Sequence, residues 1–506
     1  MFGQDRGSGV LVALHGHGDD PASARRWGRG MAPPGWEIVA PGAPTGSDGV
    51  RSWFSTGPRG VSPEELFAAV RRVADVVSRV RAAGRPVVVA GFSQGGAVAL
   101  SLPQHGIAAD AIVAVGSFLP EVDGGLGDGG ALAASPVLVV TTRDDQDVPP
   151  FFGEDAAAHL RLLGVDAELA ELEGGHEVGA GVQRHVSRWI AGALRQGPRV
   201  TLGLPTDRVD CGAELVSGAA VAELSVAFER LGFDALYVTD HPAPDDRWMA
   251  AGGHHSLDPA AVLSAAAAAT TTIGLHTNVY VLPYRNPFLA AKQLASVDVL
   301  SGGRLILGVA AGYLRQEFDA LGVPFEERAA RLDEALELLP HIWAGETVAG
   351  ESTLEGAGVW RARGATALPI PLQHPHPPIW VGGNSTAAMR RAIRFGQAWS
   401  PFPTPADTRG LRTVAIHDLS TLRERLSRCA ELCEEAGRTE PLSICFSPFS
   451  GAGYRQEPST GLAPMVEEIG QLAELGVHWV SLAVPGTTRA EVRERAAELS
   501  EALGLR

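Results

Sequence analysis

The segment Val87-Val88-Val89-Ala90-Gly91-Phe92-Ser93-Gln94-Gly95 decides the fold of the first part of the chain. Its first four residues are apolar and predict a short buried strand, and the next five form the pattern G-x-S-x-G. The apolar residues 97–100 that follow predict a helix. Glycines flank the serine because a strand–turn–helix connection is tight and leaves little room for side chains. The pattern therefore predicts that Ser93 lies exposed at the turn as a nucleophile.

Strand and helix patterns alternate on both sides of this segment. The strand candidates are Val10–Leu14, Glu37–Ala40, Pro86–Ala90, Ala111–Val115, Val137–Thr141 and Ala167–Leu172. Helical periodicity separates them, most clearly at Glu64–Arg81, and a last helix is expected at Val182–Leu194. Mostly apolar strands between amphipathic helices predict a mostly parallel sheet that helices cover on both faces.

A serine attacks an ester only when a base removes its proton and an acid orients that base. Asp145 follows the strand candidate 137–141, and His176 follows the strand candidate 167–172. Both side chains are therefore expected at strand ends, as the nucleophile is. The chain order serine, aspartate, histidine is the order found in α/β-hydrolases.

Residues 8–195 resemble the phospholipase/carboxylesterase family of small α/β-hydrolases. The matching segments are 14–19 (LHGHGD), 51–54 (RSWF), 91–95 (GFSQG), 145–149 (DQDVP) and 174–176 (GGH). The resemblance implies Ser93 as nucleophile, His176 as base and Asp145 as the acid. It also implies an oxyanion hole made by the backbone N–H groups of His17 and Gln94, and no cofactor.

Alternatives to this assignment stay open at two places. Residues 141–144 read Thr-Thr-Arg-Asp where the family usually has His-Gly, so Asp144 and Asp147 are alternative acids. His15 and His17 have the spacing of a metal-ligand pair, although the hydrolase loop explains this spacing better. A hydrolase fold that has lost its substrate is a further alternative.

A second alternation of strands and helices begins after the polar segment 195–199 (RQGPR). The strand candidates are Val200–Leu204, Ala235–Val238, Ile273–Val279, Arg304–Val309, Ile379–Val381, Gln397–Ser400, Leu442–Phe446 and Trp479–Ala483. A helix-like segment follows each of them, except where the insertion Gly345–Pro378 intervenes. About eight such units in about 300 residues predict a TIM (β/α)8 barrel. We therefore expect an α/β chain of two domains, an α/β-hydrolase at residues 1–196 and a barrel at residues 197–506.

The active sites of such barrels lie at the carboxyl ends of the strands. The candidates there are Asp240, His241, Asn278, Val279, Gly312, Gly382, Gly383, Asn384, Ser385 and Thr386. The last five form a glycine-rich turn that opens a helix, and free N–H groups together with the helix dipole favour a phosphate there. Arg390 and Arg391 on that helix would add positive charge.

Residues 199–505 resemble the luciferase-like monooxygenase superfamily, and within it the oxidoreductases that use the deazaflavin coenzyme F420. The matching segments are 231–235 (LGFDA), 238–241 (VTDH), 301–309 (SGGRLILGV) and 377–383 (PPIWVGG), with the helix-opening Ser385. The resemblance implies an isoalloxazine-like ring in the barrel mouth, its phosphate at residues 383–386, and a cis peptide bond between Asn278 and Val279. It also implies that His241 faces the ring and the substrate as a hydrogen-bond donor or proton shuttle.

Tyr313 separates this chain from the sugar-phosphate dehydrogenases of that family, because it stands where they carry an acidic residue that assists alcohol oxidation. We therefore expect substrate reduction or monooxygenation rather than sugar oxidation. The expected cofactor is F420, and FMN with oxygen is the alternative. In a further alternative the hydrolase half is a non-catalytic interaction module.

Composition limits the partners of the chain. Fifty-eight acidic residues stand against 42 basic ones, for a formal charge of −16, which argues against nucleic acid or an anionic membrane. The four cysteines include no C-x-x-C pair and no signal peptide is evident, so we expect a reduced, cytoplasmic location.

The histidines at 254–255 and 374–376 lack further ligands at suitable spacing, so we expect no metal. The expected partners are a small ester, a small organic redox substrate and a second copy of the chain bound through its barrel.

Overall fold

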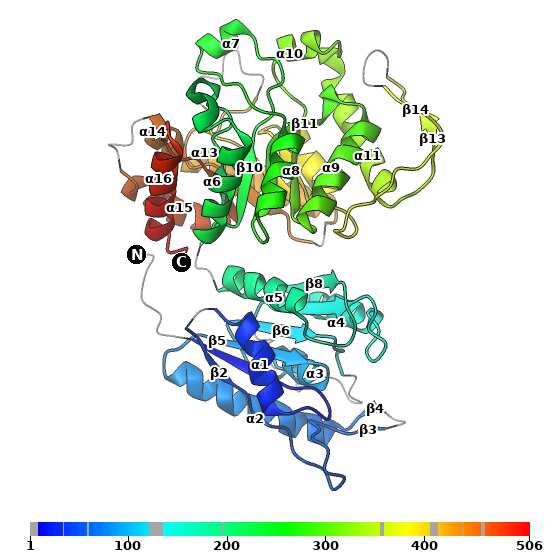
Figure 1. Cartoon of the computed structure of the whole chain (residues 1–506). Helices are drawn as coiled ribbons and strands as arrows, with labels where there is room; N and C mark the ends of the chain where they lie inside the picture. Colours follow the sequence, from blue (N-terminus) through cyan, green and yellow to red (C-terminus); the bar gives the residue numbers. More distant parts are fainter. Residues whose placement is uncertain are drawn as a thin grey trace. The chain divides into compact units, whose positions relative to one another are not determined.

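The computed structural model describes residues 9–505 except 34, 58–59, 121–134, 195–196, 355–358, 405–412, 439 and 457–460. The described residues form two compact units, one before and one after residues 195–196. The first unit is coloured blue to cyan in Figure 1, and the second is coloured green to red. No helix in the described ranges is long and apolar enough to cross a membrane.

A six-stranded parallel sheet forms the first unit. Its strand order is β2 (Glu37–Val39), β1 (Val10–Leu14), β5 (Val87–Phe92), β6 (Ala111–Val115), β7 (Val137–Thr142) and β8 (Ala167–Leu172). Every pairing between neighbours is parallel. The central strands are apolar and buried because both faces of the sheet are covered. A short antiparallel pair, β3 (Thr56–Gly57) and β4 (Gly60–Val61), lies outside this sheet.

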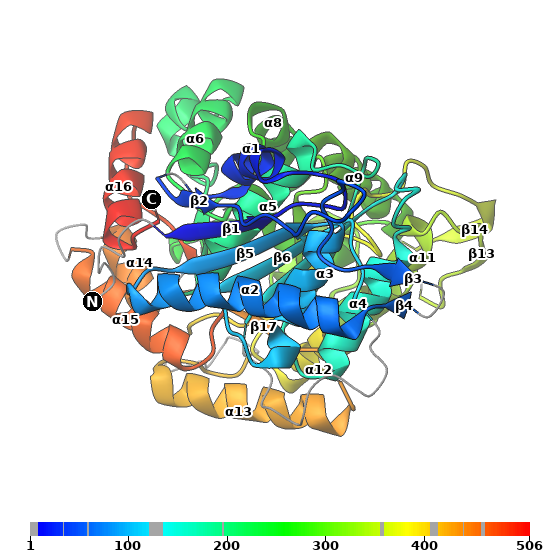
Figure 2. The ribbon, with the colours of Figure 1, turned by 90° about the horizontal axis from the view of Figure 1, so that it is seen from below.

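Two groups of helices cover the sheet. The helices α1 (Pro21–Met31) and α5 (Ala180–Ala193) pack on one face, and α2 (Pro63–Ala82), α3 (Gln94–Ser101) and α4 (Phe151–Leu162) pack on the other. Figure 2 shows α1 and α2 on opposite sides of the strands β1 and β5. The predicted parallel sheet with helices on both faces is confirmed. Because all strands are parallel, their carboxyl ends meet at one edge of the sheet.

Eight parallel strands close into a barrel in the second unit. In chain order they are β9 (Arg199–Gly203), β10 (Ala235–Val238), β11 (Gly274–Val281), β12 (Leu305–Ala310), β15 (Ile379–Gly382), β16 (Ala398–Ser400), β17 (Ser443–Phe446) and β18 (Trp479–Leu482). Each strand pairs with its neighbour in this order, and β18 pairs with β9 to close the ring. The predicted TIM barrel is confirmed.

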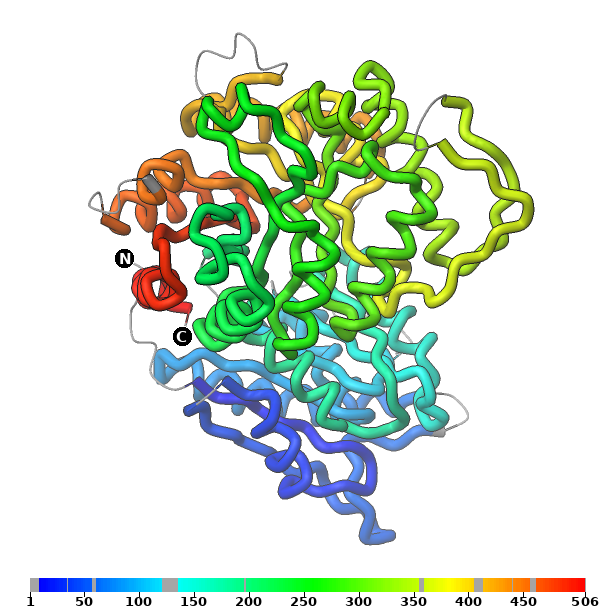
Figure 3. Tube along the Cα trace, turned by 45° about the horizontal axis from the view of Figure 1, so that its top comes forward, coloured from blue at the N-terminus to red at the C-terminus, as the bar shows by residue number. Residues whose placement is uncertain are grey.

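Helices surround the barrel. The longer ones are α6 (Gly218–Arg230), α8 (Pro259–Ala269), α9 (Pro287–Ser301), α11 (Arg328–Trp343), α12 (Thr386–Phe395), α13 (Leu419–Glu435), α15 (Ala463–Glu474) and α16 (Arg489–Ala502). The short helices α7 (Asp246–Ala250), α10 (Arg315–Ala320) and α14 (Phe449–Gln456) lie in loops after β10, β12 and β17. The insertion carries an antiparallel hairpin, β13 (Val348–Glu351) and β14 (Arg361–Ala365), which stands away from the strands of the barrel in Figures 1 and 3.

Arg304 accounts for part of the sequence pattern at residues 301–309. Its buried guanidinium donates hydrogen bonds to the carbonyl oxygens of Thr270 and Ile273. A buried cation is stable there because several acceptors surround its N–H groups. The arginine thereby connects the end of α8 and the start of β11 to β12. The arginine of the segment 301–309 therefore has a structural role in the barrel.

Candidate active sites

Ser93 occupies a strained turn between β5 and α3. Its φ of 53° and ψ of −120° make it the only non-glycine residue with a positive φ among the described residues. A Cβ atom at Gly91 would lie 2.1 Å from the carbonyl oxygen of Gly95, and one at Gly95 would lie 2.2 Å from that of Leu14. Both positions therefore require glycine, as the sequence pattern predicts.

Asp145 holds the histidine of this site. Its Oδ2 lies 2.8 Å from Nδ1 of His176, and the Asp145 side chain is fully buried. Its Oδ1 accepts the backbone N–H groups of Asp147 and Val148 at 3.0 and 2.8 Å. Of the aspartates that the sequence left open, which include Asp144, Asp145 is the one whose carboxylate meets the imidazole. A carboxylate at Nδ1 leaves Nε2 of the histidine to take a proton.

Close neighbours fix the position of the His176 imidazole. Gly116, with a φ of 51°, passes so near that a Cβ atom there would lie 3.0 Å from Asp145 Oδ2 and 3.3 Å from His176 Nδ1. The ring centroid of Phe92, the residue before the nucleophile, lies 4.7 Å from that of the imidazole. The carboxyl ends of β5, β6, β7 and β8 thus all contribute to one site.

Gln94, the residue after the nucleophile, is held by three residues that precede β3. Its side-chain oxygen accepts hydrogen bonds from the Ser52 hydroxyl and the Trp53 backbone N–H, both at 3.1 Å. Its side-chain nitrogen donates to the Phe54 carbonyl at 3.0 Å. In the part of the chain that the structure describes, the backbone N–H groups of Gln94 and His17 have no acceptor. Both groups are therefore available to an oxyanion.

His15 is a structural histidine of the loop after β1. It is fully buried, its Nδ1–H donates to the Gly16 carbonyl at 2.8 Å, and its Nε2 accepts the Ala43 N–H at 3.1 Å. His17 is exposed to solvent. Because both ring nitrogens of His15 are engaged, the geometry gives no support to a metal pair at these two histidines.

Aromatic side chains border the hydrolase site. A cavity of about 370 Å³ lies beside His176, and Trp27 contributes to its lining. The ring of Phe118 lies 6.4 Å from that of Phe152, which lies 4.2 Å from that of Phe151. The last two side chains are 43% and 52% exposed and lie at the start of α4.

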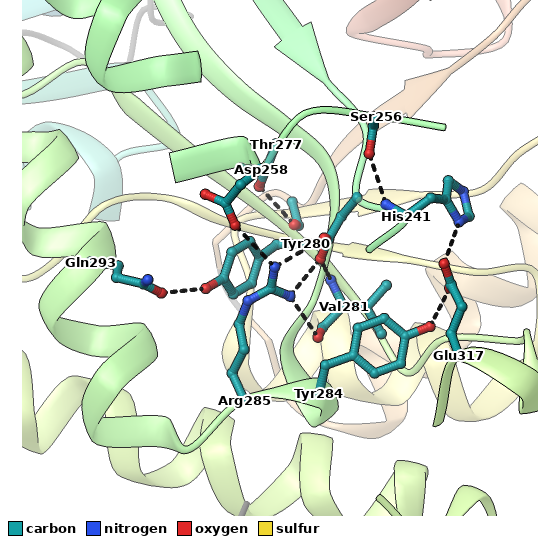
Figure 4. Close-up of polar contacts among 12 residues, drawn as sticks. His241, Ser256, Asp258, Thr277, Tyr280, Val281, Tyr284, Arg285, Gln293 and Glu317 are labelled. Atoms are coloured by element: carbon teal, nitrogen blue, oxygen red, sulfur yellow. Dashed lines mark hydrogen bonds and ion pairs between the residues drawn. The ribbon is translucent and has the colours of Figure 1, made fainter. Parts of the chain in front are cut away.

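Asp240, at the end of β10, is engaged inside the barrel. Its buried carboxylate accepts both terminal nitrogens of Arg285, at 2.6 and 2.9 Å, and the Val281 backbone N–H at 2.9 Å. The guanidinium also lies 3.9 Å from the ring centroid of Tyr280, and Figure 4 shows Arg285 beside Tyr280. Because both carboxylate oxygens are engaged within the protein, Asp240 joins the ends of β10 and β11. Its predicted role as a cofactor ligand stays a prediction.

His241 lies among ring side chains at the mouth of the barrel. Its ring centroid lies 4.5 Å from that of Trp248, 4.9 Å from that of His254 and 6.1 Å from that of Tyr313. Its Nδ1 lies 3.5 Å from Oε1 of Glu317, as Figure 4 shows. This buried nitrogen makes no hydrogen bond among the described residues. The arrangement suits a histidine that exchanges a proton with a bound ligand.

Burial changes the acidity of the groups around His241. It lowers the pKa of His254, and partial burial with the nearby Glu317 carboxylate raises the pKa of Tyr313, whose side chain is 59% exposed. Burial, together with a 2.6 Å hydrogen bond to Glu317, raises the pKa of Tyr284. At neutral pH both tyrosines are therefore protonated and His254 is neutral.

The peptide bond between Asn278 and Val279 is cis, as the resemblance predicts. Gly382, at the end of β15, lies close to it, because a Cβ atom there would be 3.1 Å from Val279 Cγ1. Gly312, with a φ of 79°, has no space for a side chain, since a Cβ atom would lie 2.7 Å from Val281 Cγ1. Predicted cofactor residues on β11 and β15 are thus brought together.

The glycine-rich turn after β15 opens α12. The Ser385 hydroxyl accepts the Ala388 N–H and caps the helix. The buried Asn384 side chain bonds to the backbone of Phe402 and Val414, which holds the turn against the loop after β16. Asn384 therefore offers a cofactor its backbone rather than its side chain.

The cation nearest to this turn differs from the two that the sequence suggests. Arg391 pairs with Asp333 at 2.5 and 2.9 Å, and Arg390 is exposed. Arg425, on α13, donates to the carbonyl oxygen of residue 384 at 3.0 Å and lies 3.5 Å from the Thr386 hydroxyl. No sequence motif marked Arg425, because it comes from a different helix.

A cavity of about 930 Å³ opens at the barrel mouth. Its lining includes Tyr237, Met249, His254, Phe402, Ser447 and Arg455. Arg455 forms an ion pair with Asp207, and burial raises the pKa of Tyr237 to about 12. These side chains come from β10 and from loops after β9, β10, β16 and β17, so no contiguous pattern marked them.

The residues of the barrel mouth fit a deazaflavin or flavin cofactor. Gly382 and Gly383 pack closely against the protein, since Cβ atoms there would lie 3.1 Å from Val279 Cγ1 and 3.3 Å from Ala388 Cβ. The unbonded Nδ1 of His241 is a buried polar atom at the same mouth. The amino terminus of α12 favours an anionic group beside this space.

Comparison with known proteins assigns both units. A phospholipase/carboxylesterase model matches residues 2–191, and a luciferase-like monooxygenase model matches residues 202–449. An FMNH(2)-dependent dimethylsulfone monooxygenase from Pseudomonas putida is 38% identical over 112 residues, which are 22% of this chain and 30% of that protein. An F420-dependent glucose-6-phosphate dehydrogenase from Nakamurella multipartita is 30% identical over 240 residues, which are 46% of this chain and 66% of that protein.

The chain thus spans less than two thirds of the length of these two relatives. Among solved structures, the monooxygenase RslO1 from Streptomyces bottropensis is 23% identical with a TM-score of 0.47, covering 60% of this chain and 98% of that one. The two family matches fall on the two compact units. The chain therefore joins a phospholipase/carboxylesterase domain to a luciferase-like monooxygenase domain, both of which belong to enzyme families.

Proposed function

We propose that this chain is a bifunctional enzyme. Its first domain hydrolyses a small carboxylic ester or thioester, and its barrel transfers a hydride between coenzyme F420 and an organic substrate. The observation that carries the first activity is the 2.8 Å contact between His176 and the buried Asp145, next to the strained turn at Ser93. The second activity rests on His241, whose buried Nδ1 makes no hydrogen bond among the described residues, at the mouth of the barrel.

The hydrolase reaction passes through an acyl-Ser93 intermediate. Nε2 of His176 takes the hydroxyl proton as Ser93 Oγ attacks the carbonyl carbon, and then gives it to the leaving alcohol or thiol. Asp145 stabilises the imidazolium that forms. The backbone N–H groups of His17 and Gln94 bind the negative charge on the carbonyl oxygen. Water then attacks the acyl group as His176 takes its proton, and His176 gives this proton to Ser93 Oγ as the bond to the acyl group breaks and the acid leaves.

A fluorophosphonate probe tests the hydrolase, because it bonds covalently to an activated serine. We expect the wild-type chain to be labelled and Ser93→Ala to remain unlabelled. Ser101→Ala is the matched control, since the Ser101 hydroxyl donates to the Ala97 carbonyl within α3 and should leave labelling intact. An unlabelled, folded wild-type chain would contradict the proposal and favour a non-catalytic interaction module.

In the barrel, the cofactor would be held by Asn278–Val279, Gly312 and residues 382–386. The bound deazaflavin supplies the group that accepts or gives up a hydride. His241 holds or releases a proton on its imidazole beside the substrate. Tyr313 carries no carboxylate to assist alcohol oxidation, which supports substrate reduction. The 30% identity to a protein named as F420-dependent supports the choice of cofactor.

Cofactor fluorescence tests the barrel. We expect the purified, cofactor-free chain to bind F420 saturably and FMN weakly. Gly382→Val should abolish this binding, because its side chain would overlap Val279. Gly453→Ala is the control, since a Cβ atom there meets no heavy atom within 4 Å. Preferential binding of FMN would contradict the F420 assignment.

An FMN-dependent monooxygenase is the second candidate for the barrel. The observation that favours it is the 38% identity over 112 residues to the FMNH(2)-dependent monooxygenase. Oxygen uptake by the FMN-loaded chain, together with weak F420 binding, would select this candidate.

A further inference from the structure

Glu317, on α10, is a buried carboxylate that contacts His241. Its side chain is 1% exposed. The Tyr284 hydroxyl donates to Oε2 at 2.6 Å, and the Ala243 backbone N–H donates to Oε1 at 3.3 Å. Nδ1 of His241 lies 3.5 Å from the same Oε1, and Figure 4 shows the three side chains in a row with Glu317 in the middle. Of these three neighbours, His241 is the one that can carry a positive charge.

The surroundings of Glu317 favour a proton on the histidine. A buried carboxylate is costly unless hydrogen bonds or a positive charge stabilise it. Burial and the bond to Glu317 raise the pKa of Tyr284, so this hydroxyl donates a hydrogen bond and keeps its proton. The carboxylate therefore stabilises a proton on the nearest ring nitrogen, Nδ1 of His241.

The other titratable groups around His241 do not replace Glu317 in this role. Burial keeps His254, whose ring lies 4.9 Å away, neutral at pH 7, and Tyr313 keeps its proton. Asp240 is neutralised by its bidentate pair with Arg285. Among the described contacts, Glu317 is thus the negatively charged group nearest to the imidazole of His241 that has no other cationic partner.

We infer that Glu317 is a positioning residue that holds a proton on Nδ1 of His241 and leaves Nε2 to exchange a proton with the substrate. This inference rests on the proposed redox function of the barrel. When the substrate is reduced, the Nε2–H bond breaks and the proton goes to the substrate heteroatom, while a bound reduced deazaflavin would supply the hydride. In the opposite direction the proton returns to Nε2, and Glu317 stabilises the imidazolium.

Nitrogen-15 NMR of histidine-labelled, cofactor-free chain tests the inference without any substrate. His241→Gln assigns the resonances. We expect Nδ1 of His241 to be protonated in the wild type, and also in Glu317→Gln, whose amide oxygen carries a partial negative charge at the same position. In Glu317→Ala the preference for Nδ1 should be lost. A wild-type His241 protonated on Nε2 alone, or an unchanged tautomer in a folded Glu317→Ala, would overturn the inference.

Kinetics of the loaded enzyme separate positioning from a structural role. Glu317→Gln should lower kcat about tenfold to 100-fold, with KM and cofactor affinity within about twofold of wild type. Glu326→Gln is the matched control, because Glu326 is exposed and pairs with Arg315 outside this cluster. An unchanged kcat in Glu317→Gln would overturn the inference. If the wild-type enzyme showed no redox activity but gave the expected NMR result, the proposed redox function would be overturned. The role of Glu317 in keeping Nδ1 of His241 protonated would still stand.

Discussion

The two candidate sites are assembled in different ways. In the hydrolase, the functional groups follow directly on the ends of neighbouring strands, and glycines stand where a Cβ atom would overlap the backbone or the catalytic side chains. In the barrel, the partners of His241 come from separate loops and short helices. Backbone geometry demands particular residues at particular spacings, whereas side chains that meet across loops leave no such pattern.

This difference also separates how the sites should respond to substitution. The turn at Gly91–Gly95 cannot accommodate a side chain at either glycine, because the atoms closest to both positions are backbone atoms, which cannot move aside as a side chain can. The mouth of the barrel contains charged side chains that form ion pairs with each other, such as Asp240 and Arg285. We therefore expect steric changes to dominate in the first site and charge changes to dominate in the second.

The largest effect is expected from Gly95→Ala. The new Cβ atom would lie 2.2 Å from the Leu14 carbonyl oxygen, so the turn must move and displace both the nucleophile and the Gln94 N–H. Fluorophosphonate labelling should slow by about 100-fold or more, while F420 binding by the barrel stays unchanged. Gly181→Ala is the control, since a Cβ atom there meets nothing within 4 Å. Labelling of Gly95→Ala at the wild-type rate would refute the steric argument.

A charge change in the barrel comes next. Asp240→Asn removes the buried, bidentate carboxylate partner of Arg285 and should lower the free energy of unfolding of the barrel by about 3–5 kcal/mol. Urea unfolding followed by tryptophan fluorescence and F420 binding measures this loss. Asp258→Asn, at a half-exposed carboxylate 3.6 Å from the same arginine, should cost less than about 1 kcal/mol. Equal decreases in the free energy of unfolding in the two variants would show that burial of the carboxylate does not determine the cost of removing its charge.

Acid should destabilise both domains through one buried histidine in each. Burial lowers the pKa of His185 to about 4 and that of His276 to about 3. The unfolded chain binds these protons near pH 6.5, so stability is highest above that pH and falls as pH decreases. Each histidine contributes a fall of up to about 1.4 kcal/mol per pH unit, which ends near pH 4 for His185 and near pH 3 for His276. His185→Leu should flatten the decline in the first domain alone, and an unchanged slope would argue against the effect.

The smallest expected effect is a gain in stability. Gly453 lies within α14, and a Cβ atom there meets no heavy atom within 4 Å. Gly453→Ala should therefore stabilise the barrel by about 0.5–1 kcal/mol, because alanine loses less backbone entropy in a helix. The midpoint of urea unfolding of the barrel measures this gain. A lower midpoint in Gly453→Ala would contradict the argument that a Cβ atom is tolerated at Gly453 but not at Gly95.

Much of the architecture was predictable from local patterns. The G-x-S-x-G turn, the order of Asp145 and His176, and the strand ends of the barrel all follow from residue spacing and apolar periodicity. The strand candidate Ala235–Val238 coincides with β10, and the helix candidate Glu64–Arg81 lies within α2, one residue shorter at each end. These elements are predictable because a strand or helix is recognisable from its own residues.

The barrel site shows where such prediction stops. Asp240 pairs with Arg285, a partner on the chain segment after β11 that no sequence pattern indicated. The cation at the glycine-rich turn is Arg425 rather than Arg390 or Arg391. In both cases the partner lies one or more barrel units away, and its distance in sequence carries no information about the contact.

Chain order and spacing were thus enough to specify a serine turn on a parallel sheet and a closed eight-stranded barrel, because glycine requirements and apolar periodicity act over a few residues. The tertiary structure was needed to bring Glu317 to His241 and Arg285 to Asp240, because these contacts join loops that follow the neighbouring strands β10, β11 and β12. The pairing of β18 with β9 completes the lining of the 930 Å³ cavity, and the burial that sets the charges of these groups exists in the folded chain alone.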